Sequence, residues 1–389
     1  MHGVARLSGT VKHYDWGGIH FIPTLLKAEN KTLQPFAEYW MGVHPLGVSN
    51  VHFSGGETRL LTELDGNLSY LLKILDVKDM LSIQVHPSKS SAEQEFEREN
   101  REGIPVDSPK RNYKDNNHKP EMLVALGDFY LLHGFKTEKL LHAILAVVPE
   151  LNSLLPVFGK NNYAELYKTV MTMPQEQVNA LLSPLIKRIV PQYKEGKLGK
   201  EIEDFWAARA ALSFSKDENI DRGIFSIYLF NLVHLKKGEA LFQGAGLPHA
   251  YLEGQNVELM SNSDNVLRGG LTTKHIDVDE LLKHVKCEPT VPKLLEGKEI
   301  GLHTKLFSPP VRDFQLIMTE LNKGETVDLN ATATEIILVP EGQVKIEGTD
   351  VELLPGQPAA IVFKNSTFSI RGIGDKSIVF RASEAVHIS

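Results

Sequence analysis

The alternating run of residues 81–87 carries two side chains that can bind a metal ion. Successive side chains of a strand point to opposite faces, so Gln84 and His86 should project on the same side, about 7 Å apart. At that separation the two could bind one small cation. The same pattern is also typical of an ordinary strand with one polar face, so the metal interpretation depends on ligands elsewhere in the chain.

Two further stretches supply such ligands. Glu121 ends the charged segment 112–121 directly before an apolar run, so its carboxylate should stand where the chain enters a sheet. His249 follows a glycine-rich turn and a proline. Together with Gln84 and His86 they form a set of nitrogen and oxygen donors that suits Zn²⁺ with room for substrate or water. The alternatives are a solvated loop for the charged segment and a structural hydrogen bond for the histidine.

The elements that position these residues follow from the hydrophobic pattern. Residues 1–134 contain short apolar or alternating runs between Gly, Asn and Asp turns, which predicts a sheet. Residues 135–230 show apolar side chains at helical spacing, which predicts an inserted helical domain. Strand-like runs return over 231–300 and should complete the first sheet. Residues 301–389 contain only short strand-like runs, which predicts a second β-barrel or sandwich.

Composition limits the class of protein. A chain of 389 residues predicts two or three domains, and 42% hydrophobic with 23% charged residues is typical of a soluble globular protein. The net charge of −7 argues against a nucleic-acid partner, and no apolar run is long enough for a membrane span. The single cysteine, Cys287, excludes an internal disulfide and suits a reducing compartment. We therefore predict a cytoplasmic enzyme or binding protein.

Six motifs occur in order along the chain: Y-D-W-G at 14–17, E-Y-W-M-G at 38–42, S-I-Q-V-H-P at 82–87, Y-K-D-N-N-H-K-P-E at 113–121, P-H-A-Y-L at 248–252 and N-S-D-N-V-L-R-G-G-L-T-T-K at 262–274. They resemble the motifs of the type I mannose-6-phosphate isomerases, which are zinc-dependent cupin enzymes. The resemblance covers residues 10 to about 285, and the stretch at 113–121 is its most specific part. It implies a mainly β protein with an α insert.

In more detail, the resemblance implies a cupin (jelly-roll) catalytic domain, an inserted helical domain and a carboxy-terminal cupin-like β domain without metal. That last domain contains only His303 and His387, so it has no histidine cluster. The family's zinc ligands fall on Gln84, His86, Glu121 and His249, with one Zn²⁺ per chain. Its active-site arginine matches Arg268, and its other polar positions match Lys73, His118, Lys119 and Glu258.

The reaction implied is the interconversion of mannose 6-phosphate and fructose 6-phosphate by a cytoplasmic monomer that supplies a precursor of GDP-mannose. The proton must move between C2 and C1, and a cation must stabilise the enediolate. Glu258, His118 and Lys119 are each able to carry the proton, and the sequence does not choose among them. Arg268 would fix the enediolate or the phosphate, because a guanidinium is a poor base.

Lys73, Lys89 and Lys274 are the remaining candidates for contacts with the phosphate. For each, an ordinary surface lysine is the alternative, and it applies least to Lys73, which lies inside the apolar run 71–75. Two other functional classes stay open: a sugar-phosphate-binding cupin without catalysis, and a cupin oxygenase that uses iron. The glutamine ligand argues against iron.

Overall fold

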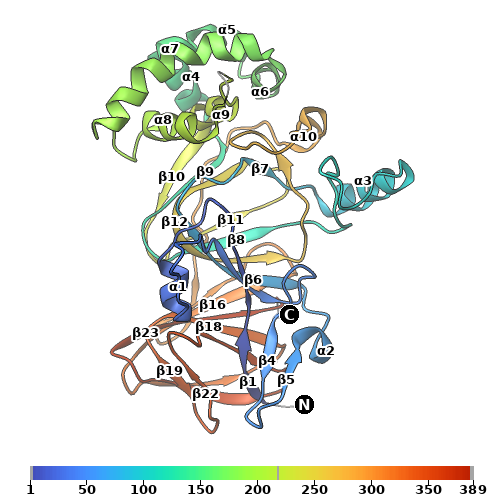
Figure 1. Ribbon diagram of the computed structural model, residues 1–389, viewed down its shortest axis with the longest axis vertical. Helices are drawn as coiled ribbons and strands as arrows, with labels where there is room; N and C mark the ends of the chain where they lie inside the picture. Colours follow the sequence, from blue (N-terminus) through green and yellow to red (C-terminus); the bar gives the residue numbers. More distant parts are fainter. Residues whose placement is uncertain (1–2, 217–218, 386–389) are drawn as a thin grey trace.

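The computed structural model describes residues 3–216 and 219–385, which form an elongated molecule with helices at one end and sheets in the middle and at the other end (Figure 1). The helices are α1 (Phe21–Leu26), α2 (Leu61–Leu64), α3 (Lys89–Arg101), α4 (Glu138–Val147), α5 (Leu155–Phe158), α6 (Tyr163–Thr172), α7 (Gln175–Lys194), α8 (Glu203–Phe214), α9 (Gly223–Leu229) and α10 (Val278–His284), with a 3₁₀ turn at Pro149–Leu154. None of the described helices is long and apolar enough to cross a bilayer.

The central sheet has ten strands and is built around β12 (His249–Ser261). Its other strands are β2 (Thr10–Lys12), β3 (Glu38–Gly42), β6 (Tyr70–Val77), β7 (Gln84–Val85), β8 (Glu121–Ala125), β9 (Phe129–Phe135), β10 (Phe230–Leu235), β11 (Ala240–Gln243) and β13 (Leu267–Arg268). Strand β12 pairs with β6, β7, β8 and β9, all antiparallel. The segments that carry the predicted metal ligands therefore meet at one strand.

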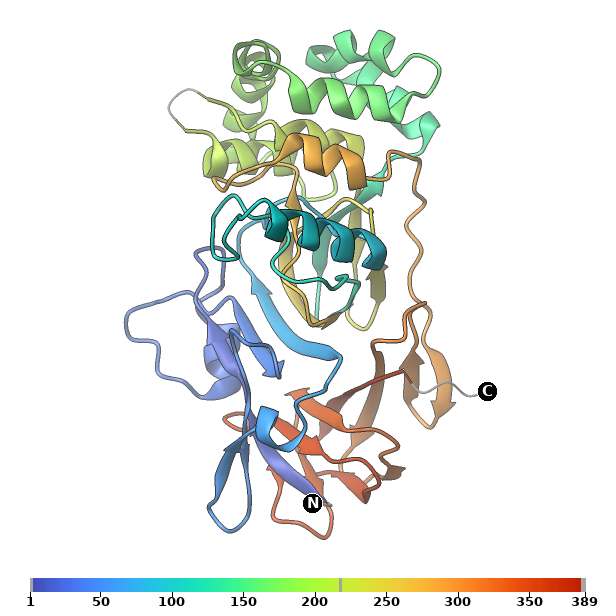
Figure 2. The ribbon, with the colours of Figure 1, turned by 90° about the vertical axis from the view of Figure 1, so that its right-hand side faces the viewer.

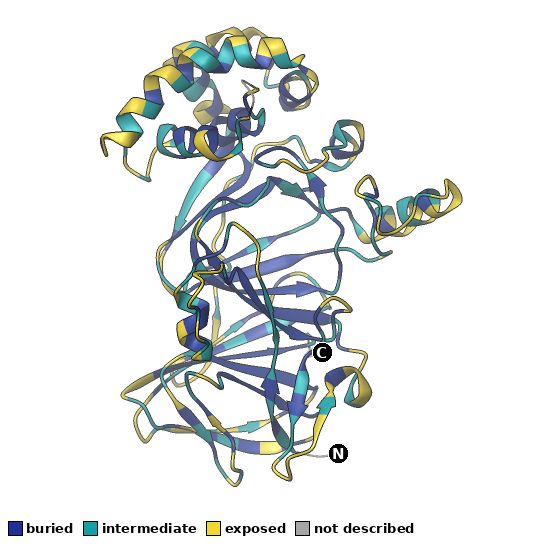
Figure 3. Ribbon diagram, in the orientation of Figure 1, coloured by how far each residue is buried: buried dark blue, intermediate teal, exposed yellow. Residues whose placement is uncertain are grey.

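Helices α4 to α9 cap this sheet, and they all lie between β9 and β10 in the sequence. Side chains such as Trp206, Tyr167 and Phe225 pack with sheet residues such as Val85 and Leu252 in one buried cluster. Burying each large apolar side chain contributes about 1.5–3 kcal/mol, so the insert is firmly seated on the sheet. The outer faces of these helices are exposed, as the periodicity requires (Figure 3). The prediction of a helical insert is confirmed.

The other end of the molecule contains a nine-stranded and a four-stranded sheet. The strands of the nine-stranded sheet, in order across it, are β14 (Lys298–Gly301), β15 (Thr304–Phe307), β16 (Gln315–Asn322), β23 (Lys376–Ser383), β18 (Glu335–Glu341), β21 (Ala359–Val362), β1 (Val4–Ser8), β4 (Asn50–His52) and β5 (Thr58–Leu60). The second contains β17 (Thr326–Asn330), β22 (Thr367–Gly372), β19 (Val344–Ile346) and β20 (Glu352–Leu353). The amino-terminal strands β1, β4 and β5 thus belong to the sheet of the carboxy-terminal region. The predicted domain boundaries remain a prediction.

The central sheet and the nine-stranded sheet are joined by packing and by one long segment. Leu72 and Ile74 of β6 lie in the same buried cluster as Ile336 and Phe380 of the nine-stranded sheet. Figure 2 shows the chain after α10 running down the outside of the central sheet to β14. His303 lies in the turn between β14 and β15, whereas His387 is outside the described residues.

Two local predictions need correction. The alternating run 81–87 was expected to form a strand, but only Gln84 and Val85 are in β7. The long helix α3 interrupts a region that was expected to be sheet. Its sequence is almost entirely polar, so it has no apolar stripe to reveal it, and its start is marked instead by Ser88, which accepts a hydrogen bond from the Ser91 N–H.

Candidate metal centre and active site

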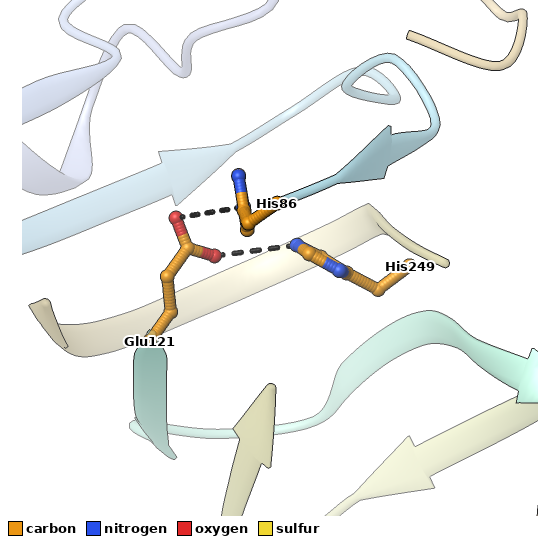
Figure 4. A group of neighbouring side chains, drawn as sticks. All are labelled: His86, Glu121 and His249. Atoms are coloured by element: carbon orange, nitrogen blue, oxygen red, sulfur yellow. Dashed lines mark ion pairs between the residues drawn. The ribbon is translucent and has the colours of Figure 1, made fainter. Parts of the chain in front are cut away.

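Three buried side chains meet where β7, β8 and β12 come together in the central sheet; we call His86, Glu121 and His249 the metal centre. Glu121 and His249 begin β8 and β12, and His86 directly follows β7. One ligand atom of each lies within 4.8 Å of the other two. Figure 4 shows the Glu121 carboxylate facing both rings, with its oxygens 3.4 Å from His86 Nε2 and 3.3 Å from His249 Nε2.

Hydrogen bonds on the far side of each ring fix the tautomer. His86 Nδ1 lies 2.8 Å from the carbonyl oxygen of Asn265, and His249 Nδ1 lies 3.0 Å from that of Leu247. A carbonyl oxygen can only accept, so both Nδ1 atoms carry a proton and donate it. Burial lowers the pKa of His86 to about 4, which keeps that ring neutral. His86 Nε2 therefore presents a lone pair toward the carboxylate, and the neutral tautomer of His249 that donates through Nδ1 does the same.

This arrangement fits a bound divalent cation. His86 Nε2 is buried and has no hydrogen-bond partner among the described residues. Although burial opposes ionisation, nearby Lys119 holds the pKa of Glu121 well below its ordinary value. Two lone pairs aimed at a buried carboxylate repel it unless a cation lies between them, and histidines held through Nδ1–H to a carbonyl are typical of metal ligands.

Gln84 stands beside this centre. It is the register partner of His249 between β7 and β12, and directly opposed residues of an antiparallel pair project on the same face. Its side chain lines the same cavity as Glu121 and His249. The structure therefore brings together all four side chains that were predicted to bind metal.

The cavity beside the metal centre is strongly polar. Its lining consists of Glu38, Lys73, Leu75, Leu81, Gln84, Lys119, Glu121, His249, Ala250, Tyr251 and Glu258. The buried Lys73 ammonium lies 3.1 Å from Glu258 and 3.4 Å from Glu38. The Tyr251 hydroxyl donates to the other oxygen of Glu258 at 2.9 Å. Burial raises the pKa of Glu258, which places a weaker acid than usual next to the metal centre.

Arg268 lies on β13, next to β7, and is not among the residues that line the cavity. It is the register partner of Gln84, which in turn is opposite His249, so the three residues lie in one row across β13, β7 and β12. Within residues 3–216 and 219–385, no carboxylate pairs with the Arg268 guanidinium. It is half-buried, and that burial lowers its pKa. A partly buried cation without a counter-ion is suited to bind an anionic ligand.

The remaining predicted residues are placed less centrally. Lys119 contacts Glu121 at 3.1 Å and lines the cavity, but His118 turns toward Asp313, with its Nε2 3.0 Å from that carboxylate. Lys89 begins α3, is half exposed and donates to the Asn117 side chain at 2.9 Å. Lys274 is exposed on the loop after β13; both burial and the neighbouring Arg268 lower its pKa.

Sequence reasoning missed Glu38 and Tyr251, which both line the cavity. Each lies within a motif that was recognised, but neither was singled out as a functional residue. A carboxylate inside a strand that is otherwise buried was the available signal for Glu38, the same signal that drew attention to Lys73. Tyr251 had no such signal, because a buried tyrosine in a strand is common.

Comparisons with known proteins agree with this geometry. Residues 4–138 match the family model described as phosphomannose isomerase type I, catalytic domain. The mannose-6-phosphate isomerase of Escherichia coli (strain K12) is 34% identical over 96% of this chain and 99% of its own length. A crystal structure of zinc-bound mannose 6-phosphate isomerase has a TM-score of 0.84 at 30% identity, covering 98% of this chain and 100% of that one.

A further solved structure is that of mannose 6-phosphate isomerase from Salmonella typhimurium bound to fructose 6-phosphate and zinc, with a TM-score of 0.83, 30% identity and the same coverage. Matches of this extent leave no large part of the fold unaccounted for. The architecture is the cupin fold with a helical insert, as the motifs predicted. On these grounds the chain belongs to the type I mannose-6-phosphate isomerase family.

Proposed function

We propose that this chain interconverts mannose 6-phosphate and fructose 6-phosphate with one Zn²⁺ held by Gln84, His86, Glu121 and His249. The observation that carries the proposal is the buried, unpartnered Nε2 of His86 facing the Glu121 carboxylate. The relatives are named for this reaction, and one of them was crystallised with fructose 6-phosphate and zinc. Two imidazoles, a carboxylate and an amide oxygen make a donor set that Zn²⁺ accepts.

When bound, zinc supplies a Lewis acid that stabilises negative charge on the sugar oxygens. The chain's own residues must move the proton and position the sugar. Of the three predicted proton carriers, Glu258 and Lys119 line the cavity, whereas His118 pairs with Asp313. Glu258 suits the task because burial raises its pKa, so this carboxylate accepts a proton more readily than an ordinary glutamate.

The positive charge that would bind the phosphate or stabilise the enediolate lies on and near β13. Arg268 has no carboxylate partner in the described part of the chain, and it contributes to lowering the pKa values of both Lys114 and Lys274. Arg268 therefore stands close enough to each of these two lysines to repel it. An anionic substrate would relieve that repulsion, which favours its binding here. Lys89 is placed farther out, beside Asn117, and contributes less.

The surroundings in which the enzyme works are also inferred. A net charge of −7 argues against nucleic-acid partners, and a single thiol suits a reducing cytoplasm. Burial raises the pKa of Cys287 to about 12, so it is an inert thiol. We infer a cytoplasmic monomer that acts on mannose 6-phosphate in supplying a GDP-mannose precursor.

The test is a coupled assay on mannose 6-phosphate before and after chelation. Activity should disappear when the metal is removed and return when Zn²⁺ is added back, with a mock-dialysed sample as control. Full activity after verified removal of the metal would exclude the zinc mechanism. Binding of the sugar phosphate without turnover, at full zinc content, would favour a binding protein instead.

A further inference from the structure

One carboxylate of the helical insert accepts hydrogen bonds from the loop that follows β13. Asp221 lies just before α9, and its Oδ1 accepts hydrogen bonds from the backbone N–H groups of Gly223 at 2.7 Å and Leu271 at 2.8 Å. Its Oδ2 accepts from the Thr272 N–H at 3.2 Å. Leu271 and Thr272 lie between Arg268 and Lys274, so Asp221 holds the segment that carries both predicted anion contacts.

The backbones are in direct contact at this junction. A Cβ atom on Gly223 would lie 2.5 Å from the Leu271 nitrogen, and one on Gly270 would lie 2.4 Å from the Gly223 Cα. Neither position has room for a side chain. Gly270 has a φ of 121° and Leu271 a φ of 53°, and a non-glycine residue in that region costs about 1–3 kcal/mol. The contacts around Gly270 and Leu271 hold the segment in this strained backbone conformation.

The same segment is fixed on its other side to the strand of the metal centre. The Gly269 N–H donates to the Ile83 carbonyl at 2.9 Å, and the Ile83 N–H donates to the Gly270 carbonyl at 3.0 Å. Ile83 directly precedes Gln84, the register partner of Arg268. Residues 269–272 are therefore clamped between Ile83 and Asp221.

Within the described residues, the Asp221 carboxylate makes no hydrogen bond or ion pair besides these three hydrogen bonds. Its neighbour Arg222 donates instead to the Met171 carbonyl, and no ion pair joins Asp221 to any cation. Burial raises the pKa of Asp221, so keeping a carboxylate here carries a free-energy cost. Three backbone N–H groups, two of them from the loop after β13, offset that cost.

We propose that Asp221 is a positioning residue for the substrate's anionic group: through Leu271 and Thr272 it fixes the loop that places Arg268 and Lys274. The inference rests on the proposed function, because it assigns these two cations to the sugar phosphate. It gives the helical insert a role in the active site, although none of the cavity-lining residues comes from helices α4 to α9.

The experiment compares Asp221→Ala and Asp221→Asn with the control Asp204→Asn. Asp204 is a carboxylate of the same insert that accepts from Tyr228 at 2.7 Å and Arg188 at 3.0 Å and does not touch the loop. Asp221→Ala should raise KM for mannose 6-phosphate at least tenfold and weaken inhibition by inorganic phosphate equally, at unchanged zinc content. Asp221→Asn, which keeps one acceptor oxygen, should be intermediate. The control should lower Tm and leave KM alone.

Hydrogen exchange supplies a readout that does not depend on activity. The amides of Leu271 and Thr272 should lose protection in Asp221→Ala, while the Leu281 amide, which donates to the Asp277 carbonyl just before α10, should not. Unchanged KM with unchanged exchange would overturn the proposal, and so would a KM effect equal to that of the control. An inactive wild-type protein would refute the proposed function alone. If Asp221→Ala does not fold, Asp221→Asn carries the test, and an unchanged KM with unchanged protection of the Leu271 and Thr272 amides would count against the clamp.

Discussion

Two groups of histidine and glutamate side chains hold their ligand atoms within 4.8 Å of one another, yet they differ in what surrounds them. One is the metal centre. The other, which we call the helical group, consists of Glu95 of α3 with Glu280 and His284 of α10. Proximity alone does not separate the two, because both satisfy the same distance criterion.

The helical group already has its cations. Arg98 pairs with Glu95 and, at 3.3 Å, with Glu280, which also receives Lys283 at 2.8 Å. The Tyr113 hydroxyl lies 2.7 Å from Glu280 Oε1 and 2.8 Å from His284 Nε2. In the metal centre Lys119 approaches Glu121, but His86 Nε2 has no hydrogen-bond partner in the described structure and only the Glu121 carboxylate nearby at 3.4 Å. A buried ligand atom left without a proton or a partner is what marks a place for a metal ion.

The largest expected difference between the two groups is tested by removing one histidine from each. His249→Ala should lose the zinc and lower kcat/KM about a thousandfold, which corresponds to about 4 kcal/mol of transition-state stabilisation. His284→Ala should keep both zinc and activity, because its group binds no metal. Metal analysis and kinetics on the two variants check this. Loss of zinc in His284→Ala would show that the metal binds at the helical group and not at the metal centre.

The second contrast concerns cations. Arg268→Ala should keep the zinc but lower kcat by about a hundredfold to a thousandfold, since a preorganised cation beside the developing charge is lost. Arg268→Lys should rescue little, because an ammonium lacks the planar set of guanidinium donors. Arg98→Ala, which removes a neutralised arginine, is the control and should leave kcat unchanged. Near wild-type kcat in Arg268→Ala would remove this residue from the active site.

A smaller effect is expected on stability in the helical group. Glu280→Gln removes a buried charge from its partners Lys283 and Arg98, so the free energy of unfolding should fall by about 1–3 kcal/mol. Activity per folded molecule should not change. The exposed Glu102, which also contacts Arg98, is the matched control, and Glu102→Gln should change stability by no more than about 0.5 kcal/mol. Chemical denaturation monitored at neutral pH measures both.

The smallest effect is the pH dependence of that contribution. Although burial alone raises the pKa of Glu280, its three hydrogen-bond partners hold it at about 2, below the ordinary 4.5. The unfolded chain therefore binds a proton first, so the stabilisation is fully present above pH 4.5 and is lost as the pH falls toward 2. The stability difference between wild type and Glu280→Gln should shrink over that range. A constant difference would show that the carboxylate charge is not what stabilises the group.

The sequence patterns offered a set of possible metal ligands, and the resemblance to the type I mannose-6-phosphate isomerases assigned zinc to them. Glu121 ends a dense polar stretch, and Gln84 and His86 alternate with apolar residues. The sequence could not show the contacts that hold these stretches together. The Asn265 side chain, for example, accepts from the Lys114 N–H at 2.7 Å and donates to the Asp115 carbonyl at 2.8 Å, which joins two motifs about 150 residues apart.

The sequence likewise predicted some elements of the fold and missed others. Helical periodicity identified α4 and α6, because their apolar stripes face a core. Helix α3 escaped because its residues are polar on nearly every side. The pairing of β1 with β21 was also invisible, since a partner more than 350 residues away leaves no local pattern. The sequence therefore missed an element without an apolar stripe and a pairing that only the tertiary structure creates.

The most direct test of the central claim is a crystal structure of the zinc-loaded protein with anomalous data collected at the zinc edge. We predict a single peak per chain, about 2.0–2.2 Å from His86 Nε2, His249 Nε2 and a Glu121 oxygen, with Gln84 completing the set. No peak should stand beside Glu95, Glu280 and His284. A peak at the helical group, or an empty metal centre in active protein, would contradict the account.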